Sequence, residues 1–555
     1  MVFSLATGFA VAQDSPCPAP LKVGLKIVQV TGGPKMAVWY PTVDAETVYQ
    51  YSSDVAGSVA RDGRISTCRR FPLVVFSHGY GGCGFQSLFL TEQLARTGYV
   101  VAAPDHKDAL CSVDGSGSST LLPSQESFLA PQDWTDQTYL DRRNDMGKAI
   151  DFVLASPDLS PGVDPGRIGA MGHSLGGYTV IGLAGGWTTW KDPRVKAVLG
   201  LSPYSLPFLV VDRLHQIDIP VMLQGAQGDI GITPFLMGNT GVYGRLQPPK
   251  FFLQLQGGTH FEWTNLLCLG ISTINGCLAS RPNAPLIVGY ARGFFDLYLN
   301  QSDSNIRQLN GAGLTTYQRL VPLTSVQAAS YVPGAAVSPE SIVAGFGATL
   351  SPQTITPGQP SLPQTLANVS VAVTDSSGSV RTAPLYLVSP GQINYVLPTG
   401  VATGPATIAV WSAGAQVATG NVQVASVAPS VFSAKGSGAG AAAAQYLRAG
   451  SGSGNLIDIF DTATLEPIPI DLGGESDQVY LVIYGSGMRG KGQSIQATIG
   501  GTATPVAGPF VQSTYAGLDQ VNLGPLPRSL AARGVMNIVL TVDGKPTNPV
   551  TVNIR

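Results

Sequence analysis

The stretch RIGAMGHSLGGYTVIGL, residues 167–183, decides how the first half of this chain folds. Its first five residues are typical of a buried strand, and residues 177–183 are typical of a helix. Between them stands Gly172-His173-Ser174-Leu175-Gly176, a Gly-x-Ser-x-Gly motif that puts its serine on a sharp strand-to-helix turn. Glycines suit both ends of the motif, because side chains there would collide with the neighbouring backbone. We therefore expect Ser174 to be a nucleophile, the alternative being an ordinary turn in a chain with 67 glycines.

A nucleophilic serine needs a general base, and in this arrangement the histidine follows the serine in the chain. Of the five histidines, His215 and His260 lie beyond Ser174. His260 follows the strand-like run at 251–255 through a flexible Gly-Gly-Thr segment, whereas His215 lies in a short helix-like stretch. The sequence predicts His260 as the base and His215 as a surface histidine.

The acid that orients the base should leave the carboxyl end of the preceding strand. That strand is residues 220–224, and Asp229 follows it, so we expect Asp229 to be the acid rather than a solvated loop carboxylate. Asp212 and Asp218 precede the strand and belong at the opposite edge of the sheet.

An oxyanion formed at this serine needs two backbone N–H groups. Leu175, directly after the nucleophile, supplies one. The buried strand at 71–76 runs into Ser77-His78-Gly79-Tyr80-Gly81-Gly82, whose glycines allow the Tyr80 amide to supply the other. The Tyr80 ring is expected to contact the acyl part of a substrate or to be a passive rim aromatic. The expected substrate-binding residues are Tyr80, His173, Tyr204 and Phe261.

Strand and helix patterns alternate through the first 300 residues. Strand-like runs fall near 71–76, 99–104, 167–171, 195–202, 220–224 and 250–255, with helical spacing at 88–96 and 146–154. This alternation predicts an α/β fold with a doubly wound, mostly parallel sheet. The stretch 204–220 is too short for a cap domain, so we expect an open site with rims at 112–137 and 230–249.

Four segments carry a family resemblance: FPLVVFSHGYGG (71–82), LARTGYVVAAPDH (94–106), RIGAMGHSLGGYTVIGLAGG (167–186) and GGTHF (257–261). They resemble the predicted dienelactone-hydrolase group of α/β-hydrolases, the platelet-activating-factor acetylhydrolases, and the bacterial cutinases and polyester hydrolases. The resemblance spans roughly residues 22–300 and implies a serine esterase using the residues named above. True dienelactone hydrolases have a cysteine nucleophile where this chain has Ser174. Bacterial cutinases carry a tryptophan near the position of Tyr204.

Composition limits the partners of this 555-residue chain. Its net charge is −2 and 12% of its residues are charged, with no basic cluster to bind nucleic acid or an anionic membrane. No apolar run reaches the ~20 residues of a transmembrane helix. Residues 1–12 are apolar and end in Ala-Val-Ala, which indicates a signal-peptide remnant or else an apolar N-terminus without a targeting role.

All six cysteines lie in the first half of the chain, in no zinc-binding pattern. In an exported protein an even set indicates three disulfides, although six cysteines allow fifteen pairings. Cys268 and Cys277 are close in sequence, and Cys83 and Cys111 follow two strands expected to be adjacent. Elimination leaves Cys17 with Cys68.

The chain changes character after about residue 328. Residues 331–555 contain no Cys or His and only 19 charged residues, and their short alternating runs are typical of all-β sandwiches. SPGQINYVLP (389–398) repeats as AGLDQVNLGPLP (516–527), GFGATL (345–350) as YGSGM (484–488), and GPATIAVW (404–411) as GVMNIVLT (534–541). We expect two tandem immunoglobulin-like sandwiches, which resemble IPT/TIG-like domains of secreted soil-bacterial proteins. The acidic run 458–477 is interpreted as a solvated loop, with calcium binding as the alternative.

The expected organisation is a signal-peptide remnant (1–12), an α/β-hydrolase catalytic domain (13–310), a linker (311–330), a first sandwich (331–433), a low-complexity join (434–454) and a second sandwich (455–555). The expected function is a secreted, monomeric bacterial serine carboxylic-ester hydrolase of esterase, cutinase or polyesterase type, without cofactor or metal. Its C-terminal repeats are expected to bind a surface or polymer. The alternatives are a phospholipid-type acetylhydrolase, a peptidase on the same triad, and an adhesion protein with a vestigial hydrolase domain.

Overall fold

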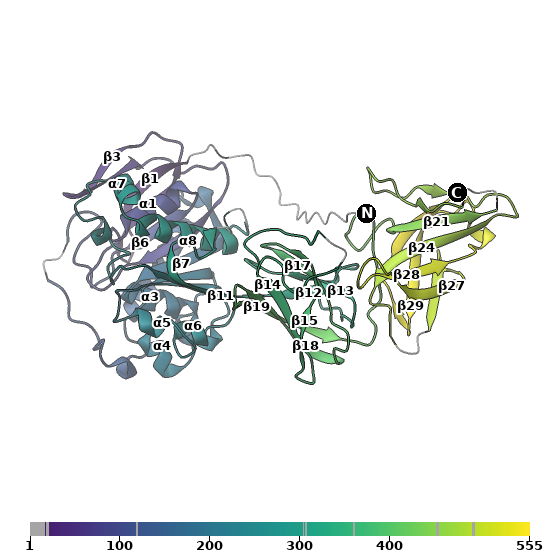
Figure 1. Cartoon of the computed structure of the whole chain (residues 1–555). Helices are drawn as coiled ribbons and strands as arrows, with labels where there is room; N and C mark the ends of the chain where they lie inside the picture. The colour runs from purple at the N-terminus through teal and green to yellow at the C-terminus, as the bar shows by residue number, and fades with distance from the viewer. Residues whose placement is uncertain are drawn as a thin grey trace. The chain divides into compact units, whose positions relative to one another are not determined.

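The computed structural model describes residue 17 and residues 21–117, 120–302, 305, 308–358, 361–450, 454–490 and 494–555. The expected signal-peptide remnant at residues 1–12 therefore lies outside the described residues. The chain divides into two compact units between Leu320 and Val321. Figure 1 labels the main helices and strands of the chain. In the described part of the chain, no helix has both the length and the apolar character needed to span a membrane.

A large mixed sheet organises the first unit, in the order β11-β10-β9-β8-β7-β5-β6-β2-β1-β4-β3. Its six central strands pair in parallel: β5 (Phe71–Ser77), β6 (Val100–Pro104), β7 (Val163–His173), β8 (Val195–Leu201), β9 (Val221–Ala226) and β10 (Lys250–Leu255). Every residue of β5 is buried, as expected of a strand covered on both faces. The parallel strands predicted from the sequence are thus confirmed within a few residues.

The outer strands of this sheet are β1 (Lys22–Gln29), β2 (Lys35–Thr42), β3 (Thr47–Ser52), β4 (Val55–Arg61) and β11 (Leu314–Pro322). β2 pairs antiparallel with β6, and β11 pairs antiparallel with β10. Most residues of β11 are only half-buried, so it lacks the apolar run that marks the central strands. The sequence did not predict these five strands.

Helices pack against the sheet in two groups. α1 (Leu88–Arg96) contacts α8 (Asn283–Tyr298), and α2 (Leu140–Ala155) contacts α3 (Leu175–Ile181). Leu73 and Val75 of β5 share one core with Met146 and Ile150 of α2, so alternate residues of β5 face the α2 side. The remaining helices are short: α4 (Leu206–Val211), α5 (Thr233–Leu236), α6 (Val242–Arg245) and α7 (Ile274–Ser280). The segment expected to be too short for a cap holds only α4 and a 3₁₀ turn at Leu214–Gln216.

Three disulfides lie in the first unit. They join Cys17 to Cys68, Cys83 to Cys111 and Cys268 to Cys277, with Cα–Cα distances of 5.4, 5.4 and 5.1 Å. These distances fall in the range that disulfide geometry requires. The three predicted pairings are confirmed.

Most strand pairs of the second unit are antiparallel. The first half holds the sheet β12 (Thr324–Gln327), β13 (Ile342–Phe346), β17 (Gln392–Val396), β16 (Leu385–Val388), and the sheet β15 (Val380–Ala383), β14 (Val369–Thr374), β18 (Gly404–Ser412), β19 (Ala415–Val424). The second half holds the sheet β22 (Ile457–Asp458), β21 (Ala444–Ala449), β24 (Gln478–Ser486), β28 (Asp519–Leu523), β27 (Val506–Val511), and the sheet β23 (Pro469–Ile470), β31 (Val550–Ile554), β29 (Gly534–Val542), β25 (Ile495–Ile499), β26 (Thr502–Ala503). Two short strands complete the second half, β20 (Ser430–Val431) against β24 and β30 (Lys545–Pro546) against β29.

The internal repeat corresponds to equivalent strand pairs. β13 pairs with β17 as β24 pairs with β28, and the third repeated segment forms β18 and β29. In each repeat the glutamine amide donates to the asparagine, Gln392 Nε2 to Asn394 Oδ1 at 2.9 Å and Gln520 Nε2 to Asn522 Oδ1 at 3.0 Å. The two segments therefore occupy the same place in two related β structures.

Two of the expected boundaries differ from the structure. Residues 311–330, expected to be a linker, contain β11 and β12, and residues 434–454, expected to be a join, contain β21. Half-buried strands rich in polar or small residues carry no strong apolar pattern, so composition alone resembled a linker.

Candidate active site

Ser174 occupies a strained turn between β7 and α3. Its φ and ψ are 54° and −116°, a conformation that a non-glycine residue seldom adopts. The flanking glycines are sterically required. A Cβ on Gly172 would lie 2.2 Å from the Gly176 carbonyl oxygen, and one on Gly176 would lie 1.9 Å from the Ser77 carbonyl oxygen. The motif thus forms the turn expected of it.

The strand ends bring the three predicted catalytic side chains together. Ser174 follows β7, Asp229 follows β9 and His260 follows β10, which all point the same way in the sheet. His260 Nε2 lies 2.8 Å from Ser174 Oγ, and His260 Nδ1 lies 3.3 Å from Asp229 Oδ2. The His260 side chain is 27% exposed and that of Asp229 only 3%. This arrangement can move a proton from the serine to a histidine that remains open to a substrate.

A residue that sequence reasoning missed, Ser202, completes the hydrogen bonding around the acid. It is fully buried directly after β8, with its hydroxyl donating to Asp229 Oδ2 and its Oγ 3.0 Å from His260 Nδ1. Burial alone would raise the pKa of Asp229, but hydrogen bonds from His260 and Ser202 outweigh it and lower the pKa. The signal in the sequence that could have indicated Ser202 was its position at the end of β8, beside the strand that carries the nucleophile.

The rejected alternatives lie elsewhere. Asp212 and Asp218 are exposed and pair with Arg245 and Lys191, at 2.9 and 2.8 Å. His215 is exposed in the 3₁₀ turn that follows α4. None of the three contacts the serine among the described interactions.

The loop after β5 lies against the nucleophile. A Cβ built on Gly79 would be 3.4 Å from the Cβ of Ser174, so the backbone leading to Tyr80 passes beside the serine. Among the described residues, neither the Tyr80 nor the Leu175 backbone N–H donates to a group of the protein. For Leu175 this follows from its place at the first position of α3, where a helix leaves its N–H groups unpaired. Both amides are thus free to bind an oxyanion.

The buried guanidinium of Arg142 binds the backbone of this loop. Arg142 of α2 donates to the carbonyls of His78 and Gly79 at 2.6 and 3.2 Å and forms an ion pair with Asp108 at 2.7 Å. Burial alone would raise the pKa of Asp108, but the charge and hydrogen bonds of Arg142 lower it to about 2. The guanidinium therefore stays paired, and it fixes the two carbonyls that precede Tyr80.

His173 and Tyr204 do not line the open site, contrary to the sequence-based expectation. His173 is 2% exposed, with its ring nitrogens 3.1 Å from Gln86 Nε2 and 2.7 Å from the His260 carbonyl oxygen. Tyr204 is 3% exposed and donates its hydroxyl to the Phe128 carbonyl at 2.8 Å. The prediction was wrong because neither proximity in sequence to the nucleophile, for His173, nor the corresponding position in related enzymes, for Tyr204, reveals which way a side chain points.

Apolar side chains remain at the mouth of the site. Phe261, next to His260, is 53% exposed, and its ring centroid lies 5.7 Å from that of His260. The half-exposed Tyr80 packs edge-on against Phe128 at 5.6 Å and donates its hydroxyl to the Leu122 carbonyl. The loop expected to form one rim therefore does contact Tyr80.

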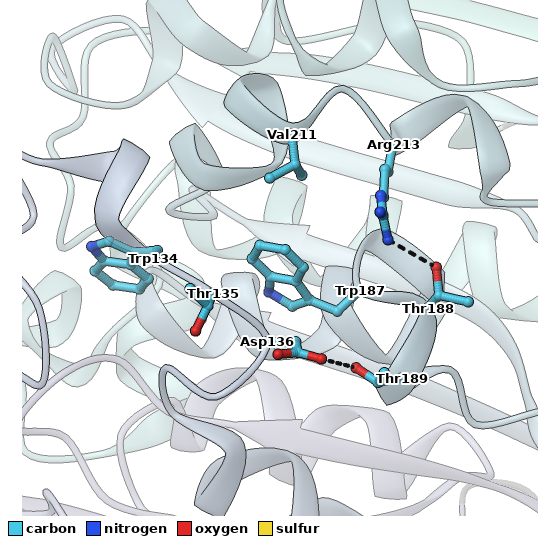
Figure 2. A pocket seen from close by; sticks show the side chains of 8 residues that line it. All are labelled: Trp134, Thr135, Asp136, Trp187, Thr188, Thr189, Val211 and Arg213. Atoms are coloured by element: carbon cyan, nitrogen blue, oxygen red, sulfur yellow. Dashed lines mark hydrogen bonds between the residues drawn. The ribbon is translucent and has the colours of Figure 1, made fainter.

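A surface hollow of about 290 Å³ lies elsewhere on the first unit. Figure 2 shows its lining, with Arg213 donating to Thr188 at 3.4 Å and Asp136 accepting from Thr189 at 2.8 Å. None of Ser174, Asp229 and His260 lines it. Trp134 lines this hollow, and its ring also packs 4.8 Å from that of Tyr204.

No metal site emerges from the described residues, which contain no group of three or more His, Cys, Asp or Glu side chains placed to hold an ion. In the acidic run 458–477, Asp461 accepts from the backbone of Ala463 and Thr464 at 2.9 and 2.8 Å. These contacts close a local turn.

Comparison with known proteins points to ester hydrolases. A family model described as platelet-activating factor acetylhydrolase, isoform II, matches residues 34–127, which include the loop that carries Tyr80. A cutinase of Thermobifida alba is 27% identical over 192 residues, which cover 34% of this chain and 52% of the relative.

Two further relatives have related names. A bis(hydroxyethyl) terephthalate hydrolase of Streptomyces coelicolor is 24% identical over 194 residues, covering 35% of this chain and 51% of the relative. A platelet-activating factor acetylhydrolase of Cavia porcellus is 24% identical over 170 residues, covering 26% of this chain and 37% of the relative. The chain thus spans about half the length, or less, of these relatives.

Proposed function

We propose that this protein is a serine carboxylic-ester hydrolase that acts through an acyl-enzyme. The observation that carries the proposal is the contact of Ser174 Oγ with His260 Nε2 at 2.8 Å, beside the carboxylate of Asp229. The named relatives support ester hydrolysis.

In the proposed mechanism His260 accepts the proton of Ser174 while Oγ attacks the ester carbonyl carbon. The carbonyl oxygen becomes an oxyanion and receives hydrogen bonds from the amides of Tyr80 and Leu175. His260 then returns the proton to the alcohol oxygen, which leaves. Water activated by His260 attacks the acyl-enzyme, and the acid is released as Ser174 regains its proton. Asp229 and Ser202 hold Nδ1 of His260 throughout.

The surroundings of the serine favour hydrophobic or polymeric esters. The histidine is partly exposed and Phe261 packs beside it, while the half-exposed Tyr80 stands on the loop that passes the serine. A second candidate, a phospholipid-type acetylhydrolase, is favoured by the family match over residues 34–127. The two differ in acyl preference, because an acetylhydrolase selects a two-carbon acyl group and a polyesterase accepts longer or aromatic ones.

Three disulfides in one unit support an extracellular setting, since such bridges persist in oxidising compartments. We propose secretion on this ground. For the C-terminal β repeats we propose attachment to a surface or polymer, a role that their position as a separate compact unit allows.

The test is hydrolysis of p-nitrophenyl esters of increasing acyl length by the full chain and by Ser174→Ala. We expect a folded variant whose kcat falls at least about 10³-fold, as when one member of a triad is removed. A serine-directed fluorophosphonate should label Ser174 alone in peptide mapping. Labelling at another residue, or full activity of the variant, would refute the serine mechanism. An inactive wild type would favour the adhesion protein with a vestigial site.

A further inference from the structure

A directed chain of hydrogen bonds joins the loop of Tyr80 to the backbone of His260. The Gly79 N–H donates to Gln86 Oε1 at 2.8 Å. Gln86 Nε2 lies 3.1 Å from His173 Nδ1, and His173 Nε2 lies 2.7 Å from the His260 carbonyl oxygen. Three hydrogen bonds thus connect the loop that carries Tyr80 to the segment that carries His260. The proposed mechanism requires these two segments to keep a fixed position relative to each other.

The chemistry of its ends fixes the direction of the chain. A backbone N–H only donates, so the Gln86 oxygen must accept and its NH₂ group donates to His173 Nδ1. A carbonyl only accepts, so His173 Nε2 carries the hydrogen. Each of the three bonds therefore has one direction, with His173 as a single neutral tautomer. The Gln86 NH₂ group also donates to the Ser87 hydroxyl at 3.5 Å. Burial lowers the pKa of His173 to about 3, which keeps the ring neutral at neutral pH.

Both intermediate residues are held rigidly. Gln86 stands just before α1, where its carbonyl accepts from the Asn265 N–H at 2.7 Å. The His173 ring packs 4.9 Å from the His260 ring and 6.2 Å from that of Trp263. The chain of hydrogen bonds thus lies in a packed region, where loss of Gln86 would leave a nitrogen of the buried His173 without its partner.

We propose that Gln86 and His173 are positioning residues that hold the oxyanion loop and His260 in the geometry needed for the transition state. This inference rests on the proposed function. His173 does not reach the substrate, since it is buried and both of its nitrogens are engaged within the protein. Gln86 is half-buried, and its amide oxygen is bound to the Gly79 N–H. Their loss should therefore impair kcat, which depends on geometry at the reacting atoms, and leave KM nearly unchanged.

The test compares Gln86→Met with Gln93→Met in the full chain. Met has the length of Gln but forms no comparable hydrogen bond. Gln93 lies on α1, the helix that Gln86 precedes, and has no side-chain hydrogen bond in the described part of the structure. His173→Phe keeps a ring in place and removes both nitrogens. With a p-nitrophenyl ester we expect Gln86→Met and His173→Phe to lose about 10- to 100-fold in kcat with KM within about twofold. Gln93→Met should match the wild type.

The double variant Gln86→Met/His173→Phe gives the sharper readout. Once one substitution has interrupted the chain of hydrogen bonds, a second interruption costs little. The kcat of the double variant should therefore be close to that of the more impaired single variant. If Gln86→Met does not fold, Gln86→Glu replaces it, because a carboxylate still accepts from Gly79 but has no hydrogen for His173. Circular dichroism and the melting temperature establish folding.

Three results would overturn the inference: single variants within twofold of the wild-type kcat, a double variant whose loss is the product of the single losses, or a rise in KM in place of the fall in kcat. Ser174→Ala, assayed alongside, separates this failure from failure of the proposed function. If Ser174→Ala is inactive while Gln86→Met is fully active, only the positioning role is wrong. If Ser174→Ala is active, the serine mechanism itself is wrong.

Discussion

Ser202 donates its hydroxyl hydrogen to Asp229, and the same oxygen lies closer to the imidazole of His260 than the carboxylate does. The Oγ-to-Nδ1 distance is 3.0 Å, whereas Asp229 Oδ2 lies 3.3 Å from Nδ1. The Nδ1–H group therefore has two acceptors, and the acid acts on the histidine partly through a serine. Ser202 itself is held at a left-handed φ of 43° by the bond from its N–H to the Gln224 carbonyl, 2.7 Å long.

Ser202→Ala should lower kcat about tenfold, because one hydrogen bond to the imidazole and one to the carboxylate are lost while the direct contact remains. Ser205→Ala is the matched control, since Ser205 is also buried but, within the described part of the chain, its hydroxyl bonds only to the Pro203 carbonyl at 3.2 Å. Steady-state kinetics on a soluble ester measure both. Equal activity of the two variants would mean that Ser202 has no part in orienting the histidine.

Asp229→Asn should lower kcat by about 10⁴-fold, because an amide can force the wrong tautomer on the histidine and cannot stabilise its charged form. The controls are Asp212→Asn and Asp218→Asn, whose carboxylates form exposed ion pairs with Arg245 and Lys191. We expect these two variants to stay within about twofold of the wild type. A larger loss of kcat in either control than in Asp229→Asn would show that Asp229 is not the acid.

The carboxyl group of Asp145 should make the free energy of unfolding decrease as pH rises. Burial raises its pKa to about 6, above the value of about 4 for an unfolded chain. Between these values the folded protein holds a proton that the unfolded chain releases, so the free energy of unfolding decreases as pH rises from about 4 to 6. Asp145→Asn removes this component, so its stability relative to the wild type should increase by up to about 3 kcal/mol over that interval.

Urea unfolding at several pH values from 4 to 7.5 measures this difference. Asp151→Asn is the control, because Asp151 lies on the same helix with a side chain that is 68% exposed. A pH dependence of the Asp145→Asn difference no larger than that of the control would contradict the prediction. His106 also bonds Asp145, at 3.0 Å, so a constant offset at all pH values is expected as well.

Truncation should distinguish the strand β11 from a linker. A chain ending after Pro322 keeps β11, whereas one ending after Asn310 loses it and exposes β10, whose residues are mostly buried. We expect the longer form to hydrolyse soluble esters like the full chain and the shorter form to melt earlier or aggregate, because an uncovered apolar edge strand invites association. On an insoluble polyester the longer form should be slower than the full chain, since a tethered binding module raises the local enzyme concentration. Equal rates on the polyester would leave the β repeats without a binding role.

Much of the sheet was predictable because its central strands are apolar on both faces. A run such as Phe71–Ser77 has no other stable place than the middle of a covered sheet. Strand β11 and the hairpin strands at residues 22–61 were not predictable in this way, because half-buried strands mix polar and apolar residues and depend on their neighbours.

For the site, the sequence by itself determined which residues stand at the strand ends. Ser174, Asp229 and His260 each follow a buried strand, and parallel strands bring such positions to one edge, so local patterns were sufficient to predict their meeting.

Only the tertiary structure decided how the surrounding side chains connect. Gln86 and His173 are 87 positions apart, and Ser202 and Asp229 are 27 apart, with no motif to relate them. The burial of His173 and Tyr204, which removed them from the expected substrate contacts, likewise depends on packing from distant segments. Hydrogen bonds between side chains require a particular distance and direction, and these are set by the packed backbone rather than by any repeating pattern along the chain.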